Sequence, residues 1–174
     1  STEITLATKE KNPKILHTIS IPWGARNSAE KFEIGDYDCK KAEKLASVIS
    51  SYSRKFVDDA NLLRYKNEIC FVATSSVPLR LAHIAYDWSV YERERADGVV
   101  VSTSEFDRAI DKVYLMDEKQ RLAHPCIGQS RADIFTAACV IFSQIYCDLG
   151  ANKIVASLKS AVDGMIMELK DGTN

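Results

Sequence analysis

The chain has 174 residues, of which 46% are hydrophobic and 27% are charged, a composition that is ordinary for a globular protein with a single apolar core. Its 23 basic and 24 acidic side chains leave a formal net charge of −1, so only local basic clusters can hold a polyanion. This balance excludes strongly basic nucleic-acid-binding proteins. We therefore expect no nucleic-acid polymer as a partner, and we expect no membrane because polar residues interrupt the longest apolar run.

Five cysteines are scattered along the chain without the paired Cys or His spacing that is typical of a zinc site: Cys39, Cys70, Cys126, Cys139 and Cys147. Their odd number argues against a disulfide framework. Three of them, Cys70, Cys139 and Cys147, stand in strongly apolar segments. We interpret these as reduced core thiols, which predicts a cytoplasmic protein.

In the first third of the chain, residues 2–8 and 14–21 alternate between apolar and polar side chains around a polar turn at 9–13, which predicts a β-hairpin. Apolar residues then recur at helical spacing over 38–58. Asp36 and Asp38 are candidates to cap that helix.

Strands and helices alternate in the middle of the chain. Residues 68–73 predict an interior strand, and Ser75 or Ser76 can cap a helix that follows to about residue 86. The charged segment 87–98 predicts an exposed loop. After a brief strand at 99–101, Ser102 and Glu105 have the spacing of a capping box that begins another helix.

The longest apolar run begins near residue 131 and predicts a core helix over 131–149. Its start carries a second capping box, Ser130 with Asp133, and Gly150 is placed to end it. A strand follows at 153–157, and then a last helix. This order predicts one α/β domain over 1–174, with a mixed sheet and helices on both of its faces.

Four segments, in order, are similar to motifs of one enzyme family. Ser1-Thr2-Glu3 resembles the end of D-x-G-G-G-S-x-E, residues 20–26 (S-I-P-W-G-A-R) resemble S-L-P-L-G-A-x-R, and residues 124–134 resemble H-P-G-I-x-x-x-R-A-D-x-I before a strand like 153–157. These are motifs of the exopolyphosphatase and guanosine pentaphosphate phosphohydrolase (Ppx/GppA) family. The chain therefore resembles that family over almost its whole length.

The resemblance implies the second domain of an actin-like ATPase (ribonuclease-H-like) fold, without its first strand and without the first domain. Since the chain begins inside the phosphate-binding motif, we expect a fragment of a longer protein whose first domain is its partner in cis. A sheet without its first strand would have an open edge, which a partner chain could fill. A homodimer is a further expectation.

For the site, the resemblance implies that Ser1 and Thr2 contribute to a phosphate cradle and that Glu3 supplies a carboxylate near the attacking water or Mg²⁺. Arg26 would face the substrate, and Thr74 and Ser75 would form a second phosphate loop. From the residues alone, Glu3 can equally be a solvent-facing strand residue, Arg26 a solvated cation and Ser75 a helix cap. These alternatives stay open. His17, His83 and His124 share no triad spacing and are interpreted as structural.

Two segments depart from the family pattern. The second loop, residues 72–76, lacks both expected glycines, and near the C-terminus Ser160 and Val162 replace a glycine and an arginine. Loss of a guanidinium removes bidentate contact with phosphate, which Lys159 cannot reproduce.

Three functions follow from this sequence. The first is Mg²⁺-dependent release of terminal phosphate from inorganic polyphosphate or guanosine pentaphosphate, with the isolated chain inactive. The second is a degenerate binding or regulatory module of the same fold, which the missing glycines and arginine favour. The third is a kinase or another member of the actin-like superfamily, because one fold hosts many activities.

Overall fold

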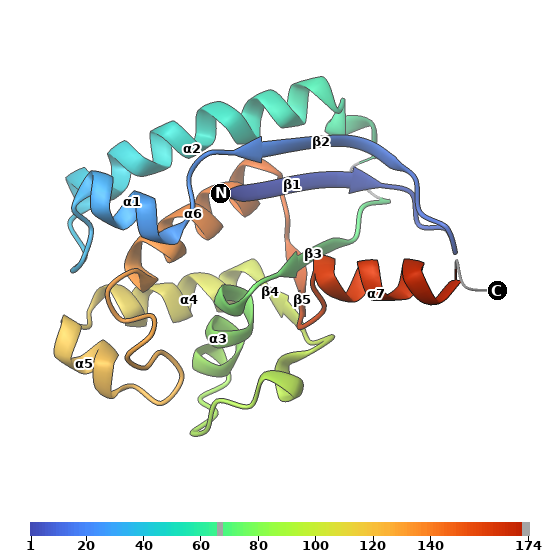
Figure 1. The fold of residues 1–174 in the computed structure, drawn as a ribbon. Helices are drawn as coiled ribbons and strands as arrows, with labels where there is room; N and C mark the ends of the chain where they lie inside the picture. The colour runs from blue at the N-terminus through green and yellow to red at the C-terminus, as the bar shows by residue number, and fades with distance from the viewer. Residues whose placement is uncertain (66–67, 172–174) are drawn as a thin grey trace.

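The computed structural model describes residues 1–65 and 68–171, and Figure 1 shows their arrangement. The elements in chain order are β1 (Thr2–Ala7), β2 (Ile15–Ile21), α1 (Ala25–Phe32), α2 (Cys39–Asp59), η1 (Leu62–Tyr65), β3 (Phe71–Thr74), α3 (Ser76–Ala85), η2 (Arg93–Ala96), β4 (Val100–Ser102), α4 (Thr103–Tyr114), α5 (Glu118–Ala123), α6 (Phe135–Asp148), β5 (Lys153–Ser157) and α7 (Ala161–Asp171). The predicted α/β class is confirmed.

The predicted hairpin is confirmed as the antiparallel pair β1 and β2, in which Glu3 lies opposite Ser20. Side chains alternate between the two faces, so Thr2, Ile4 and Leu6 share one face and Glu3 lies on the other. Ile4 and Ile21 are buried in a core with α2 and with residues of α6. This packing fixes which face of the hairpin Glu3 occupies.

The other three described strands form a second sheet in the order β3, β5, β4. β3 runs parallel to β5, whereas β4 runs antiparallel to it, so the predicted mixed sheet is confirmed. The strand predicted at 68–73 is present, but its predicted interior position is wrong. That strand begins only at Phe71 and is an edge of the three described strands, with Val72 55% exposed, because it has a hydrogen-bonded neighbour on one side only.

Helix α6 joins two hydrophobic cores. Phe135 and Cys139 pack into the core around β5, α3 and α4, whereas Val140 and Ile141 pack into the core around the hairpin and α2. Nearly every residue in its first two turns is buried, as the apolar run predicted. Gly150 follows the helix with a φ of +68°, which confirms the predicted left-handed stop.

The predicted start of this helix is wrong. Helix α6 begins at Phe135 rather than residue 131, because residues 128–134 form a series of tight turns that begin at Gly128, with φ of +69°. Ser130 and Asp133 therefore form no capping box. The Asp133 carboxylate instead contacts Arg26 on α1.

Three other predicted caps are confirmed. The Asp38 carboxylate accepts a hydrogen bond from the Lys41 backbone N–H at 3.0 Å at the start of α2. Ser102 and Glu105 form the predicted reciprocal box before α4, and Ser75 caps α3. Each cap satisfies a backbone N–H that has no partner within its own helix.

The prediction that Cys70 and Cys147 are core thiols is wrong. Cys70 and Cys147 are exposed, and Cys126 and Cys139 are the buried thiols. Cys147 lies in the last turn of α6, beyond the continuous buried stretch of that helix, which covers residues 135–141. All five thiols are free. The segment 87–98 is largely exposed, as predicted, although it contains η2 and the fully buried Ala96.

Candidate functional site

The start of β1 lies against the turn that leads into α1. A Cβ atom added at Gly24 would lie 2.8 Å from the Ser1 nitrogen and 3.2 Å from the Ser1 oxygen, so only glycine allows this approach. The Thr2 hydroxyl donates a hydrogen bond of 2.8 Å to the Trp23 carbonyl. Two segments with family-like motifs, the first at Ser1 and the second at Gly24, therefore meet in space.

Arg26 lies in the first turn of α1, two residues after Gly24. Its Nη1 atom contacts Asp133 Oδ2 at 3.3 Å, although 107 positions separate the two residues in the sequence. Their side chains are 61% and 52% exposed, so water screens the pair and its contribution to stability is small. Arg26 is thus an exposed cation held by one weak ion pair, and its role toward a substrate stays a prediction.

Glu3 lies on the exposed face of the hairpin. Its Oε1 atom accepts a hydrogen bond of 3.3 Å from the hydroxyl of Ser20, the residue opposite it on β2. In the part of the chain that the structure describes, no hydrogen bond or ion pair links Glu3 to Arg26. A carboxylate in this position is open to solvent and able to accept a proton or to hold a cation.

Thr74 is the last residue of β3, in the other sheet, and Ser75 follows it. Both are exposed, and the Ser75 hydroxyl accepts a hydrogen bond of 3.2 Å from the Val77 N–H. No hydrogen bond among residues 1–65 and 68–171 joins Thr74 or Ser75 to Ser1, Glu3 or Arg26. The structure therefore supports the helix cap as the role of Ser75, and its place in a phosphate loop stays a prediction.

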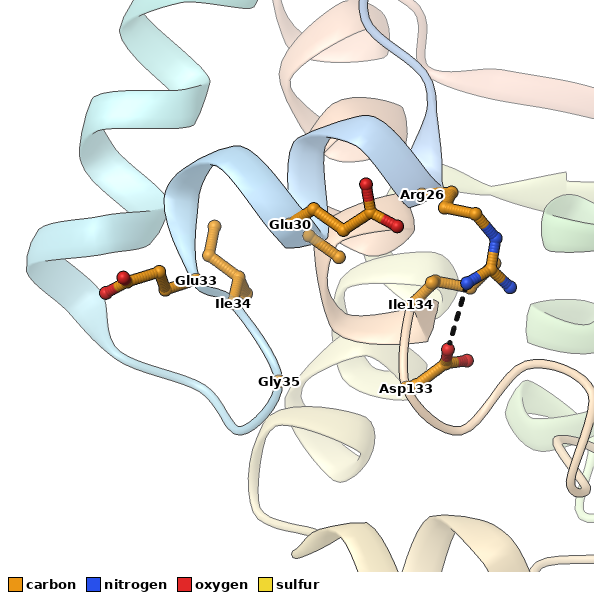
Figure 2. Close-up of a pocket in the computed structure, with 8 residues that line it drawn as sticks. Arg26, Glu30, Glu33, Ile34, Gly35, Asp133 and Ile134 are labelled. Atoms are coloured by element: carbon orange, nitrogen blue, oxygen red, sulfur yellow. Dashed lines mark hydrogen bonds and ion pairs between the residues drawn. The ribbon is translucent and has the colours of Figure 1, made fainter.

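A shallow groove of about 400 Å³ lies between α1, the segment 33–35 and the turn before α6 (Figure 2). Arg26 and Asp133 contact each other at one end of it, and Glu30 and Glu33 project from the α1 side (Figure 2). With three carboxylates and one guanidinium among its lining residues, the groove is negatively charged. A polyphosphate would be repelled here unless cations came with it.

The sequence interpretation missed Glu30 and Glu33 as neighbours of Arg26. The signal was present, because positions i, i+4 and i+7 lie on one face of a helix. Glu33 ends α1 in a left-handed conformation with φ of 52°, and Lys41 Nζ lies 3.6 Å from its carboxylate. Lys41 partly neutralises the far end of the groove.

The described residues contain no group of three or more His, Cys, Asp or Glu side chains that could hold a metal ion. Glu3 offers one carboxylate, and Mg²⁺ commonly binds proteins through only one or two carboxylates together with phosphate oxygens and water. Glu3 is thus suited to serve as one ligand of Mg²⁺. The remaining ligands would have to come from outside the described residues.

At the position where the family motif has an arginine, Val162 is 58% exposed in the first turn of α7. Ser160 donates hydrogen bonds through its backbone N–H and its hydroxyl to the Asp163 carboxylate, at 2.7 and 2.8 Å. These contacts lie at the start of α7, and neither side chain presents a cation. No described helix of the chain is both long enough and apolar enough to cross a membrane.

Comparison with known proteins finds similarity at the level of structure only. No protein-family profile matches the chain, and no curated protein sequence does. Among solved structures, one of a Ppx/GppA family member from Aquifex aeolicus superimposes with a TM-score of 0.77 at 16% identity, over 92% of this chain and 51% of that one. A type II variant of the Aquifex aeolicus Ppx/GppA phosphatase gives a TM-score of 0.75 at 17% identity, over 89% and 50%.

An exopolyphosphatase from Cytophaga hutchinsonii gives a TM-score of 0.74 at 17% identity, over 98% of this chain and 54% of that one. The chain thus spans about half the length of the structures it matches. The resemblance indicated by the motifs is confirmed at the level of the fold. This chain has the fold of part of the Ppx/GppA phosphatase structures.

Proposed function

We propose that this chain is the second domain of a cytoplasmic phosphohydrolase that releases terminal phosphate from inorganic polyphosphate or guanosine pentaphosphate. One observation carries the proposal: Ser1 and Thr2 lie against Trp23 and Gly24 in a chain with the fold of part of the Ppx/GppA structures. Two separate motifs of one phosphatase family therefore converge at the start of α1.

In this proposal, Ser1 and Thr2 contribute to the phosphate cradle. The N-terminus of α1 lies beside them, and the first backbone N–H groups of a helix favour an anion. Arg26 reaches the phosphate chain after exchanging its contact with Asp133 for one with phosphate. Because that ion pair is exposed, breaking it costs little.

Glu3 is proposed to orient and deprotonate the attacking water or to hold Mg²⁺. Its exposed carboxylate is of the right type for either role, and Ser20 fixes one of its oxygens. Magnesium, when bound, would neutralise charge on the transferred phosphate. Thr74 and Ser75 are proposed to contact a more distant phosphate through their hydroxyls.

The acidic groove supports a catalytic site whose groups are shared between this chain and a companion domain. Among the described residues, Arg26 is the only cationic one that lines the groove, so the additional positive charge that a polyphosphate needs would come from a companion domain. The same domain would complete the set of metal ligands. We therefore expect the chain alone to be folded but inactive, because catalysis requires all these groups to be held together.

The test measures phosphate release from both substrates with Mg²⁺, using the chain alone and the natural polypeptide that joins it to the companion domain. The proposal expects release only from the two-domain protein. Mg²⁺-dependent release by the chain alone would show that its site is complete. If neither protein releases phosphate, the proposed hydrolase activity is wrong.

A second candidate function, a binding or regulatory module without turnover, has its own support. Asp133 forms an ion pair with Arg26, and Ser75 acts as a helix cap. Val162 is at the position where the family motif has an arginine that would contact phosphate. Titration calorimetry on the two-domain protein separates the candidates. Saturable binding of either ligand without phosphate release would favour the module.

A further inference from the structure

Between α3 and β4 the chain forms a strap, which we define as residues 88–97. In Figure 1 it is the yellow-green segment that leads from the end of α3 to β4. Residues 92–95 are exposed, whereas Ala96 is fully buried. The structure describes every residue of the strap and shows no regular element in it beyond the short helix η2. Its position therefore depends on individual contacts with the rest of the domain.

The middle of the strap is held by His83, which lies on α3 and is fully buried. Nδ1 of its ring lies 2.7 Å from the Leu79 carbonyl oxygen, which can only accept, so Nδ1 donates. Nε2 accepts a hydrogen bond of 3.1 Å from the backbone N–H of Glu92. A neutral imidazole donates at one nitrogen and accepts at the other. These two contacts therefore fix His83 as the neutral tautomer with its proton on Nδ1.

A proton added to this ring would remove its contact with the strap. Imidazolium donates at both nitrogens, so Nε2–H would point at the Glu92 N–H, and neither group can accept. Both donors, and the new charge, would then be buried without a partner, which is unfavourable. Movement of the strap away from the ring relieves this cost, because water then reaches Nε2. Proton binding to His83 and release of the strap are therefore coupled.

The surroundings of the ring give a proton no counter-charge. The rings of Trp88 and Tyr91, both on the strap, lie edge-on to the imidazole, each with its centroid 4.9 Å away. The charged and ionisable side chains on the elements around them are Arg80 over the Tyr91 ring, Arg95 over the Trp88 ring, Cys126 against the Trp88 carbonyl, Cys139 in the same core, Lys112 on α4 and its partner Asp87, and Asp97 at the end of the strap. Among the described residues no carboxylate forms a hydrogen bond or an ion pair with His83. Three cations lie near the ring, so its neutral form is favoured while the strap is closed.

We propose that His83 is a pH-dependent latch: the neutral ring holds the strap against α3, and protonation of the ring releases it. Release would reach the end of β5, because the Asp97 carboxylate accepts a hydrogen bond of 2.8 Å from the Leu158 N–H. All of these contacts are made within this chain, around a side chain that is completely buried in it. The latch therefore depends neither on what covers the outer surfaces of the domain nor on the proposed catalytic function.

The direction of the pH dependence follows from proton binding. The closed strap keeps a proton off Nε2 and the released strap admits it, so the released form binds more protons. The closed form is therefore favoured as the pH rises, and release is favoured as the pH falls. Because an ordinary imidazole binds a proton at about pH 6.5, the equilibrium constant for release should increase about tenfold for each pH unit below that value.

The test is amide hydrogen exchange, followed by NMR on the 174-residue chain from about pH 7.5 to about pH 5. The protection factor of the Glu92 amide is its intrinsic exchange rate divided by the measured rate. In wild type it should fall about tenfold per pH unit below about pH 6.5. The amide of Ile49, in α2 and in the other core, should keep a constant protection factor. Circular dichroism checks that the fold is intact at each pH.

His83→Gln separates the latch from other titrating groups. A glutamine amide can donate to the Leu79 carbonyl and accept from the Glu92 N–H, but it does not titrate. The Glu92 protection factor should therefore stay constant with pH in this variant. His17→Gln is the matched control on β2, where the His17 ring lies 5.3 Å from that of Phe56. It should keep the fall that wild type shows.

The wild type also gives a measurement that needs no variant, which decides the matter even where His83→Gln does not fold. Nitrogen NMR spectra of the His83 ring at about pH 7.5 should show Nδ1 protonated and Nε2 unprotonated. A proton on Nε2 instead would overturn the proposal, as would a Glu92 protection factor that does not change with pH in wild type. A fall that persists in His83→Gln, or that is lost in His17→Gln, would also overturn it, since another group would then control the strap.

Discussion

Arg121 and Asp36 join α5 to the segment between α1 and α2 through a contact of 2.8 Å between Nη2 and Oδ1. The Arg121 side chain is completely buried, whereas that of Asp36 is 64% exposed. The other guanidinium nitrogens donate to the carbonyls of Ala132 and Met116, at 2.9 and 2.6 Å. One side chain therefore fixes the turn that precedes α6 and, with it, the position of Asp133 in the candidate site.

We expect Arg121→Ala to lower the free energy of unfolding by about 2–4 kcal/mol, because it leaves two carbonyls without a donor and a cavity where a large side chain was. Asp36→Asn keeps an oxygen acceptor at an exposed position and should cost less than about 1 kcal/mol. Urea titration of both variants measures this difference. Equal losses would mean that the ion pair, rather than the carbonyl contacts, dominates.

Gly24→Ala tests the close approach at the start of β1. The added methyl group would collide with the Ser1 backbone, so we expect a loss of about 1–3 kcal/mol in the free energy of unfolding. Gly35→Ala is the matched control, because nothing lies within 4 Å of its added Cβ, and its change should stay within about 0.5 kcal/mol. Indistinguishable denaturant curves for the two variants would show that Ser1 moves aside freely.

Glu3→Gln tests the proposed chemistry. In the two-domain protein we expect turnover to fall by about 10²-fold or more, as for loss of a positioned base or metal carboxylate, without loss of stability. Glu10→Gln makes the same change at an exposed position in the turn of the hairpin and should leave the rate unchanged. A Glu3→Gln rate equal to wild type at saturating Mg²⁺ would remove Glu3 from the mechanism.

Ile141 tests the central helix. It is 5% exposed on α6, so Ile141→Ala should cost about 2–5 kcal/mol through lost burial and a residual cavity. Leu115, 86% exposed, provides a control whose change to alanine should stay within about 0.5 kcal/mol. Chemical denaturation with fluorescence detection gives both values. A small loss at Ile141 would contradict the burial seen in the structure.

Asp148 should make the free energy of unfolding depend on pH. Its carboxylate, 3% exposed, accepts hydrogen bonds from Ser50, Ser53, Arg54 and Gln144. Burial raises the pKa of Asp148, but these hydrogen bonds lower it more, so its pKa lies below the ordinary value.

Because the pKa is depressed in the folded state, Asp148 stabilises the protein above its unfolded pKa of about 3.9, and this stability is lost as the pH falls through the folded value. Asp148→Asn should therefore reduce stability at pH 7 and flatten the acid limb of a plot of unfolding free energy against pH. Asp58→Asn, an exposed change on α2, should keep the wild-type slope. An acid limb that Asp148→Asn leaves unchanged would contradict this assignment.

Local patterns along the chain were enough to specify most of the individual elements. Alternation over residues 2–8 and 14–21 specified the hairpin, and Asp38 and the Ser102–Glu105 pair fixed helix starts, because a cap and the groups it satisfies lie within four residues. The motifs at Ser1 and residues 20–26 also indicated the fold. Each of these signals is short in range and can be read from consecutive residues.

The neighbours of each element, in contrast, depend on how distant segments pack together. The contact between Arg26 and Asp133, the edge position of β3 and the exposure of Cys147 depend on segments far apart in the chain. At Asp133 a local capping pattern failed, because tight turns after Gly128 placed its carboxylate against α1 instead. Such choices are set by packing among distant elements, whose small energy differences no local pattern contains.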